Sequence, residues 1–294
     1  MEKKINIYQV DAFTDQPFNG NPAGVTFGDD LTPLEMQSIA KEMNLAETAF
    51  LSNSDKADYN LRWFTPAMEV ELCGHATIAS LHFLKENNLI SNGQEITFDT
   101  LSGILRCKFE NNRYFMQIPI YTMEEFTGCK EEIFDCLGIE RNDVDDNFPV
   151  VLVENGYLYI KIQSLKALHN LKPDYNKLYK LTEPGKQCIA VYTLETVDKT
   201  SFAHSRFFAP FYGINEDPVT GSMNGPLLPV LIYSGILQNN AEEYSYVFEQ
   251  GDVLGRKGRV GVTFNKNKNE LFISGNAVTI LKGEMAFPHS GEFL

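Results

Sequence analysis

Apolar and polar positions alternate in some segments of this chain, while two other segments are apolar on nearly every side. Residues 1–10 (MEKKINIYQV) alternate, and a period of two indicates a strand with one buried face. The segments 76–86 and 222–234 have the all-round apolar pattern, which requires a buried helix. Strand-like segments follow each helix, at 104–110, 114–118, 258–264 and 270–274. The pattern therefore predicts two buried helices, each accompanied by strands.

The two helical segments belong to an internal repeat. Three pairs of segments match in the same order: RWFTP at 62–66 with RFFAP at 206–210, Gly74 with Gly221, and TFD at 97–99 with VFE at 247–249. Their separations are 144, 147 and 150 positions. A slowly drifting offset is what a duplication followed by small loop insertions produces, and chance similarity is the alternative.

The repeat predicts an α+β fold of two pseudo-symmetric halves, each a β-barrel-like sheet wrapped around a buried central helix. We expect the first half at 1–118, the second at 119–278 and a linker near 119–125, with 279–294 returning to the first half. The active site is expected between the halves. A further helix is predicted from Thr32 to Met43, because Thr32 can cap it and Glu35 follows three positions later.

Composition narrows the class of protein. The chain has 294 residues, of which 43% are hydrophobic and 22% charged, so it can bury a large core. Its net charge of −14 disfavours nucleic acid and anionic membrane surfaces as partners. We expect no membrane span and no signal peptide, because no apolar run is long enough. The five cysteines form no C-x-x-C pair, so we expect reduced thiols and a cytoplasmic location.

Both predicted helices begin at a glycine followed by a polar residue, Gly74 with His75 and Gly221 with Ser222. Free backbone N–H groups at a helix start, together with the helix dipole, form an anion site. As a repeated pair, such starts would hold a carboxylate-bearing substrate. The alternative is that each glycine only shapes a turn.

Four side chains are candidates for proton-transfer chemistry. Glu47 lies among apolar neighbours and is either a cap or a desolvated general base. His75 has the side chain best suited to acid–base work near neutral pH, although it can be structural. Asp217 precedes the second helix start, where Asp-Pro is also a common turn. Cys73 precedes the first helix and is either an activated thiol or a small buried residue.

Metal and cofactor motifs are missing from the sequence. The five histidines have no metal-ligand spacing, and the chain contains no dinucleotide, phosphate-loop or G-x-S-x-G motif. We therefore predict a protein without a metal or cofactor.

Several motifs in fixed order resemble those of the phenazine-biosynthesis-like (PhzF-like) family. They are DAFT at 11–14, GNPAGV at 20–25, NLAETAF at 44–50, RWFTP at 62–66, ELCGHAT at 71–77, EDPVTGS at 216–222 and GNAVTILKGE at 275–284. The resemblance spans nearly the whole chain. It is specific for the family and weak for the substrate.

The resemblance implies the diaminopimelate-epimerase fold and a cofactor-free isomerase. The family's studied isomerase uses a glutamate to move a proton within a dihydro-hydroxyanthranilate. By motif, the catalytic residues would be Glu47, His75 and Asp217, with the glutamate as proton shuttle. Gly74, Gly221 and Ser222 would bind the substrate carboxylate, and Asn21 and Cys73 would lie at the pocket. The resemblance also implies a homodimer.

Two other functions compete with this one. The epimerase relatives use one cysteine from each half, and this chain has Cys73 in the first loop but Asp217-Pro218-Val219 in the second. An amino-acid racemase or epimerase that uses Cys73 with another acid or base is therefore the second enzyme hypothesis. The third is a catalytically idle binding protein, against which an intact set of Glu47, His75 and Asp217 argues.

Overall fold

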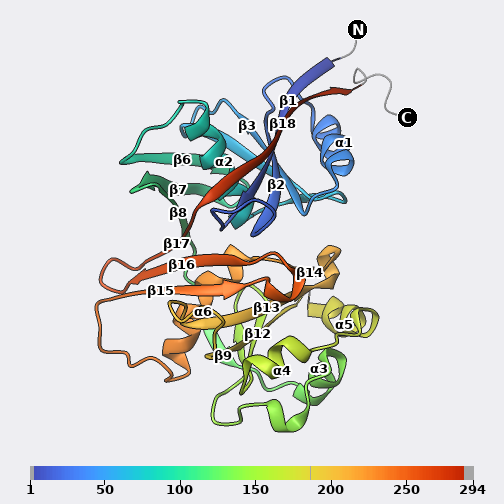
Figure 1. The fold of residues 1–294 in the computed structure, drawn as a ribbon, viewed down its shortest axis with the longest axis vertical. Coiled ribbons are helices and arrows are strands. Elements are labelled where there is room, and N and C mark those ends of the chain that lie inside the picture. Colours follow the sequence, from blue (N-terminus) through green and yellow to red (C-terminus); the bar gives the residue numbers. More distant parts are fainter. Residues whose placement is uncertain (1–2, 186, 288–294) are drawn as a thin grey trace. The chain divides into compact units, whose positions relative to one another are not determined.

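The chain, seen in a computed structural model that describes residues 3–185 and 187–287, divides into two units (Figure 1). The first unit takes in residue 117 and those before it, together with the residues from 274 onwards. The second unit takes in residues 118–273. Each unit is mixed α and β, and each is described by itself.

The first unit is built on a sheet whose strands come from both ends of the chain. Its strands are β1 (Lys3–Ala12), β2 (Asn21–Phe27), β3 (Glu47–Ser52), β4 (Tyr59–Phe64), β5 (Glu69–Val70), β6 (Gln94–Thr100), β7 (Gly103–Glu110), β8 (Arg113–Ile118) and β18 (Ala277–Phe287). Antiparallel pairs join β18 to β1 and β1 to β2, and β2 runs parallel to β3. β4 is antiparallel to β3 and parallel to β6, and β6, β7 and β8 continue antiparallel. Figure 1 shows β18 (red) lying along β1 (blue).

Two helices complete the first unit. α1 (Pro33–Met43) packs on β3 and β4. Its predicted capping box is confirmed: the Thr32 hydroxyl accepts from the Glu35 N–H, and the Glu35 carboxylate accepts from the Thr32 N–H at 2.7 Å. α2 (Gly74–Glu86) is buried from Gly74 to Leu84 and packs on β1, β2, β3 and β18. This burial accounts for its all-round apolar sequence.

The second unit has a sheet of its own. Its strands are β9 (Met123–Glu125), β10 (Val151–Val153), β11 (Tyr157–Lys161), β12 (Cys188–Thr193), β13 (Ala203–Ala209), β14 (Ile214–Asp217), β15 (Glu243–Gln250), β16 (Gly258–Asn265) and β17 (Glu270–Gly275). β10 is antiparallel to β11, β11 parallel to β12, and β12 antiparallel to β13. β13 is parallel to β15, which is antiparallel to β16. β9 pairs with β10, so the segment expected as a linker contains a strand.

The helices of the second unit are α3 (Lys130–Leu137), α4 (Leu165–Asn170), α5 (Tyr175–Thr182) and α6 (Gly221–Tyr233), with short 3₁₀ turns at Arg141–Asp143, Glu183–Gly185, Pro210–Tyr212 and Asp252–Leu254. α6 is the predicted second buried helix and packs on β11 and β16. Apolar residues of α3, α4 and α5 share a core with β11 and β12. α2 and α6 have 13 residues each, and within the described ranges no helix has the length and apolar character to cross a bilayer.

The two matching Arg-x-Phe segments have the same local structure. Arg62 in β4 forms two hydrogen bonds with the carboxylate of Glu69 in β5, at 2.6 and 2.7 Å. Arg206 in β13 does the same with Glu216 in β14, at 2.7 and 2.8 Å. Each guanidinium also lies over the phenylalanine two positions later. Paired forks of this kind are strong and directional, so these arginines are structural.

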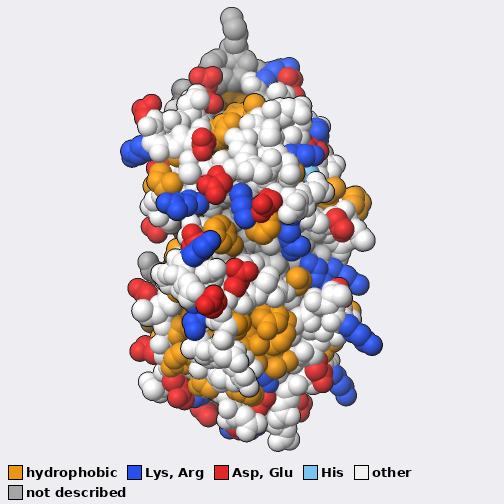
Figure 2. All heavy atoms as spheres, turned by 90° about the vertical axis from the view of Figure 1, so that its left-hand side faces the viewer, with side chains coloured by type: hydrophobic (Ala, Val, Ile, Leu, Met, Phe, Trp, Pro, Cys, Tyr) orange, Lys and Arg blue, Asp and Glu red, His pale blue; other side chains and the backbone are white. Residues whose placement is uncertain are grey.

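Acidic and basic side chains are mixed on the face of the protein that Figure 2 draws. On the face drawn in Figure 2, acidic and basic side chains are interspersed with apolar ones, and neither sign forms a continuous area. The net charge of −14 is therefore not concentrated on this face.

Candidate active site

Glu47 is placed by the pairing of two strands in the first unit. It is the first residue of β3, it lies opposite Ala23 of the parallel strand β2, and its exposed fraction is 7%. The strands approach closely here, because a Cβ on Gly24 would lie 2.8 Å from the Thr48 hydroxyl oxygen. The preceding helix α1 has its C-cap at Asn44. Glu47 is therefore a buried strand residue and not the helix cap that the sequence also allowed.

Asn21 is placed by a tight turn. It is the first residue of β2 and is completely buried. Gly20 before it has φ +62°, and a Cβ there would lie 2.1 Å from the Ala12 carbonyl oxygen. Only glycine fits such a position, which explains the Gly-Asn pair of this motif.

His75 is the contact point of the candidate site. It is the second residue of α2 and is 4% exposed. Its Nε2 lies 3.1 Å from Glu47 Oε2, out of line for a well-formed hydrogen bond but at ion-pair distance. Its Nδ1 lies 3.2 Å from the Asn21 side-chain nitrogen and 3.5 Å from Cys73 Sγ. One imidazole thus contacts three of the residues selected from the sequence.

These contacts define the tautomer of a neutral His75. With the amide placed as it is, the Asn21 nitrogen can only donate to Nδ1, which fits the neutral tautomer whose ring hydrogen is on Nε2, facing Glu47. A protonated ring carries hydrogens on both nitrogens, and Cys73 Sγ is then the acceptor at hand for Nδ1. His75 can therefore hold a proton toward the carboxylate in either state.

The charge state of His75 follows from opposing effects. Burial alone lowers the pKa of its imidazole, but the charges of Cys73 and Glu47 and their close polar contacts raise that pKa well above its ordinary value. Burial, with a smaller effect of Glu47, raises the pKa of the Cys73 thiol to about 11. The thiol is therefore uncharged at neutral pH, and Glu47 supplies the charge that raises the pKa of His75 there.

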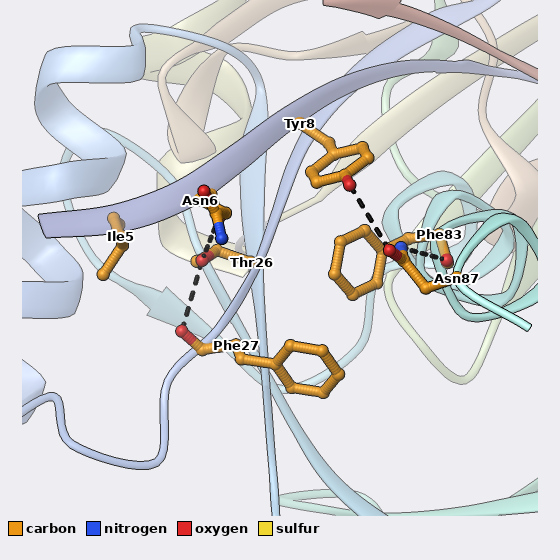
Figure 3. A pocket seen from close by; sticks show the side chains of 7 residues that line it. All are labelled: Ile5, Asn6, Tyr8, Thr26, Phe27, Phe83 and Asn87. Carbon is orange, nitrogen blue, oxygen red and sulfur yellow. Dashed lines mark hydrogen bonds between the residues drawn. The ribbon is translucent and has the colours of Figure 1, made fainter. Parts of the chain in front are cut away.

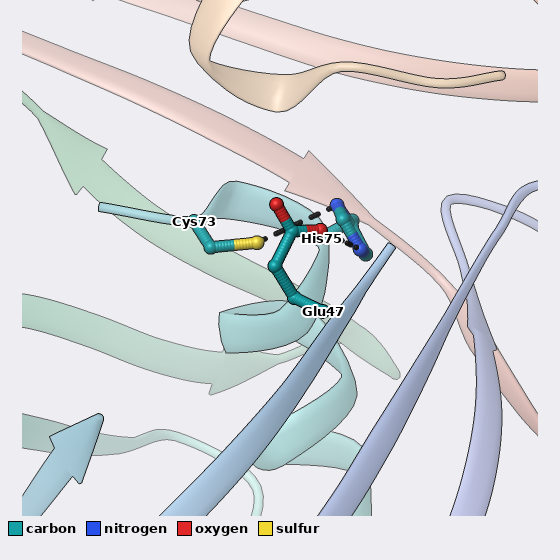
Figure 4. Close-up of side chains that lie close together, drawn as sticks. All are labelled: Glu47, Cys73 and His75. Atoms are coloured by element: carbon teal, nitrogen blue, oxygen red, sulfur yellow. Dashed lines mark hydrogen bonds and ion pairs between the residues drawn. The ribbon is translucent and has the colours of Figure 1, made fainter. Parts of the chain in front are cut away.

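Cys73 occupies the N-cap position of α2. Its carbonyl accepts from the Thr77 hydroxyl at 2.6 Å, and the residue is 5% exposed. Figure 4 shows its sulfur, the His75 ring and the Glu47 carboxylate converging from the two sides of the α2 start. Its burial and raised pKa fit the interpretation as a small buried residue and not that of an activated thiol, although its sulfur contacts His75.

In the second unit, Asp217 ends β14 and is buried. Its carboxylate accepts from the Thr220 hydroxyl, and its carbonyl accepts from the Gln250 amide at 2.8 Å. Asn224 donates to the Gln250 side chain at 2.8 Å. These contacts hold the backbone and side chain of Asp217 in place within this turn. Sequence reasoning missed Gln250 and Asn224, because isolated amides belong to no motif.

Gly221 and Ser222 open α6 as expected. Ser222 Oγ lies 3.3 Å from the hydroxyl of Tyr157 in β11. Cys188, the first residue of β12, has its thiol pKa raised by burial and then by the charge of Asp217. The structure therefore brings Asn21, Glu47, Cys73 and His75 together in the first unit, and places Asp217, Gly221 and Ser222 in the second.

A separate cavity of about 260 Å³ lies toward the other end of α2 (Figure 3). It is lined by Ile5, Asn6, Tyr8, Thr26, Phe27, Phe83 and Asn87. The Phe83 ring packs edge-on against Tyr8 and Phe27, and the Tyr8 hydroxyl lies 3.4 Å from Asn87 Oδ1. Among these described lining residues there is no carboxylate, imidazole or thiol, so this cavity has no acid–base chemistry to offer.

Comparison with known proteins gives a consistent result. The pattern of the phenazine biosynthesis-like (PhzC-PhzF) protein family matches residues 10–283. An uncharacterized isomerase of Clostridium acetobutylicum is 39% identical, over 97% of this chain and 99% of its own. One of Bacillus subtilis is 36% identical, over 90% of this chain and 92% of its own.

Solved structures share the fold. A phenazine biosynthesis protein of the PhzF family from Bacillus anthracis has a TM-score of 0.89 at 32% identity, covering 96% of this chain and 99% of its own. A hydroxyproline epimerase from Agrobacterium vitis, solved with trans-4-hydroxy-L-proline bound, has a TM-score of 0.60 at 12% identity. The match covers 99% of this chain and 95% of the epimerase chain. At 12% identity this second likeness concerns the fold alone.

Proposed function

Because the chain belongs to the phenazine biosynthesis-like protein family, and because a buried carboxylate and imidazole meet in its first unit, we propose that it is an isomerase. The proposed reaction moves a proton within a small carboxylate substrate by acid–base catalysis, without a cofactor. The observation that carries this proposal is the 3.1 Å contact between Glu47 Oε2 and His75 Nε2. The isomerase names of the Clostridium and Bacillus relatives support the reaction class.

In the proposed reaction Glu47 is the proton shuttle. Its carboxylate removes a C–H proton, and the electron pair enters the conjugated system of the substrate. The same carboxyl group then returns the proton to another carbon on that face. No atom is lost and no electron leaves the substrate, so the step needs no oxidant or reductant. His75 holds the carboxylate in place and stabilises its charge when it is ionised.

Substrate binding is proposed for the remaining motif residues. The backbone N–H groups at the start of α2, from Gly74 onward, would stabilise a substrate carboxylate, and those at the start of α6, from Gly221 onward, are proposed as an anion site of the second unit. Asn21 and Cys73 contact His75 and would shape the pocket around it. For Asp217 and Ser222 the family motif supports a role in binding polar groups of the substrate.

We also propose that the two units are pseudo-symmetric halves that arose by duplication. The support is their order of strand pairing. In the first unit an antiparallel pair, a parallel pair and a second antiparallel pair run from β1 through β4, and β4 is parallel to β6. The second unit repeats this from β10 through β13, with β13 parallel to β15. α2 follows β4 and β5, and α6 follows β13 and β14.

The test of Glu47 uses hydrogen exchange, because the substrate is defined only by class. We would incubate the protein in D₂O with a dihydro-hydroxyanthranilate and with amino acids of both hands, and follow C–H to C–D exchange by NMR. Glu47→Gln keeps the shape but cannot take the proton, so exchange should fall about 10²- to 10⁴-fold. Glu42→Gln, an exposed site in α1, is the control. Exchange by Glu47→Gln near the wild-type rate would place the base elsewhere, with His75 as first candidate.

The racemase alternative keeps one supporting observation, the 3.5 Å contact between Cys73 Sγ and His75 Nδ1. Against it stands the pKa of the thiol, about 11, which leaves little thiolate at neutral pH to act as base. Cys73→Ala should therefore keep most of the exchange activity. A loss of about a thousandfold, the scale of a deleted catalytic group, would transfer the mechanism to the thiol.

The resemblance also leads us to propose a homodimer in a reducing, cytoplasmic setting. All five cysteines are free, which fits a reducing compartment. Light scattering after gel filtration would give the mass, and a mass near the 33.2 kDa of one chain would rule out the dimer.

A further inference from the structure

Glu47, Cys73 and His75 form a donor set that a metal ion can use. One carboxylate oxygen, one imidazole nitrogen and the sulfur lie within 4.8 Å of one another, and all three residues are buried. In a tetrahedral zinc site with bonds of about 2.0–2.3 Å, neighbouring donors stand about 3.3–3.8 Å apart. Side-chain shifts of about 1 Å would therefore bring the three atoms to bonding distance.

The chemistry of these donors selects the metal. Thiolate and imidazole bind Zn²⁺ well and Mg²⁺ or Ca²⁺ poorly. Three protein ligands with a fourth position open is the arrangement of zinc sites that keep a water molecule. Glu47 Oε2 and His75 Nε2 are also buried without a well-formed hydrogen bond among the described residues. Buried polar atoms of this kind cost free energy, and a bound cation would satisfy both.

Although the sequence motifs predict a protein without a metal, we propose that the Glu47–Cys73–His75 cluster is an inhibitory Zn²⁺ site. The Cys73 S–H bond breaks as the Zn–S bond forms, and the proton passes to solvent. The imidazole binds in its neutral form and the carboxylate as an anion. The inhibition rests on the proposed function, since Glu47 and His75 cannot handle a substrate proton while they coordinate the metal. The metal binding itself does not rest on it.

Cobalt binding tests the site without using activity. Co²⁺ replaces Zn²⁺ in such sites, and a thiolate ligand gives an intense near-ultraviolet charge-transfer band. We expect one Co²⁺ per chain with this band, displaced by Zn²⁺. Cys73→Ser should lose the band and should bind Co²⁺ more than about a hundredfold more weakly. Removal of a residue that only contacts a metal ligand costs less, about 10- to 100-fold. Cys129→Ser, which changes an exposed free cysteine, should keep both.

A second variant separates the loss of a metal ligand from the loss of the fold. Glu47→Gln should bind Co²⁺ more weakly but keep the band, because the thiolate remains. Circular dichroism checks that each variant is folded. No stoichiometric Co²⁺ binding by the wild type, or an undiminished band in folded Cys73→Ser, would overturn the site.

The inhibitory role needs an activity readout. Micromolar Zn²⁺ should suppress the hydrogen-exchange reaction, and a chelator should restore it. Activation by Zn²⁺, or full activity with the metal bound, would overturn the inhibitory role. The two proposals fail separately: an active Glu47→Gln removes the proposed mechanism and leaves the cobalt band, whereas absent cobalt binding leaves the Glu47→Gln result standing.

Discussion

Glu47 and His75 form a buried pair of a carboxylate and an imidazole. Burial removes water from both side chains, whose exposed fractions are 10% and 5%, so their mutual interaction is screened little. The neutral thiol of Cys73 adds no charge near neutral pH. The raised pKa of His75 favours a protonated imidazole in this contact, which suits the proposed use of the pair in acid–base chemistry.

The raised pKa of His75 predicts how stability depends on pH. The folded protein keeps a proton on this imidazole at pH values where the unfolded chain, with a pKa near 6.5, has lost it. The stabilisation is therefore complete below pH 6.5 and is lost as pH rises through the folded pKa. In that window the free energy of unfolding should fall by up to about 1.4 kcal/mol per pH unit.

Urea unfolding of wild type and His75→Gln between pH 6.5 and 8.5 measures this effect, below the range in which the Cys73 thiol titrates. The difference between the two proteins should shrink as pH rises. A difference that stays constant over this window would show that the pKa of His75 is not raised.

The sequence identified these residues but not their contacts. Asn21, Glu47, Cys73 and His75 were selected from motifs, and the roles expected for Glu47 and His75 were separate ones. Their contact depends on the parallel pairing of β2 with β3 and on the packing of α2 against both. Pairing between strands distant in the chain is a property of the whole fold, so local patterns did not contain it.

At the scale of elements, the sequence predicted those helices whose positions depend on residues close together in the chain. Thr32, Pro33 and Glu35 form the start of α1 by contacts within one turn, and this prediction is confirmed. The all-round apolar helices are confirmed as well, and they start at the expected glycines, one or two residues before the apolar segments 76–86 and 222–234. The short helices α3 to α5 were missed, because six to eight residues give too little periodicity to distinguish a helix.

The capping box of α1 supports a prediction of its own. Thr32→Ala removes the hydroxyl that accepts from the Glu35 N–H, and loss of an N-cap costs about 0.5–2 kcal/mol. Urea unfolding should show a loss of that size. Glu42→Ala, at an exposed position of the same helix, should change stability by less than about 0.5 kcal/mol. Equal effects of the two substitutions would contradict a capping role.

At the scale of the whole molecule, two arginine–glutamate pairs of the same type, one in each unit, lie in different environments. The side chains of Arg62 and Glu69 are 25% and 24% exposed, and those of Arg206 and Glu216 are 4% and 7% exposed. Arg206 also donates to two carbonyl oxygens near the end of α4. Removing one partner of a buried pair leaves an uncompensated charge, so the two units should respond differently to the same substitution.

Glu216→Ala should therefore cost about 3–5 kcal/mol, and Glu69→Ala a smaller amount, closer to the roughly 1 kcal/mol of accessible pairs. Unfolding followed by circular dichroism reports on both units. Trp63 is the single tryptophan and is buried next to Arg62 in β4. Its fluorescence reports on the first unit. Glu216→Gln, which keeps one acceptor oxygen for Arg206, should recover part of the loss. If Glu69→Ala proves as damaging as Glu216→Ala, burial is not what distinguishes the two pairs, because the residue types and the two-bond fork are the same in both.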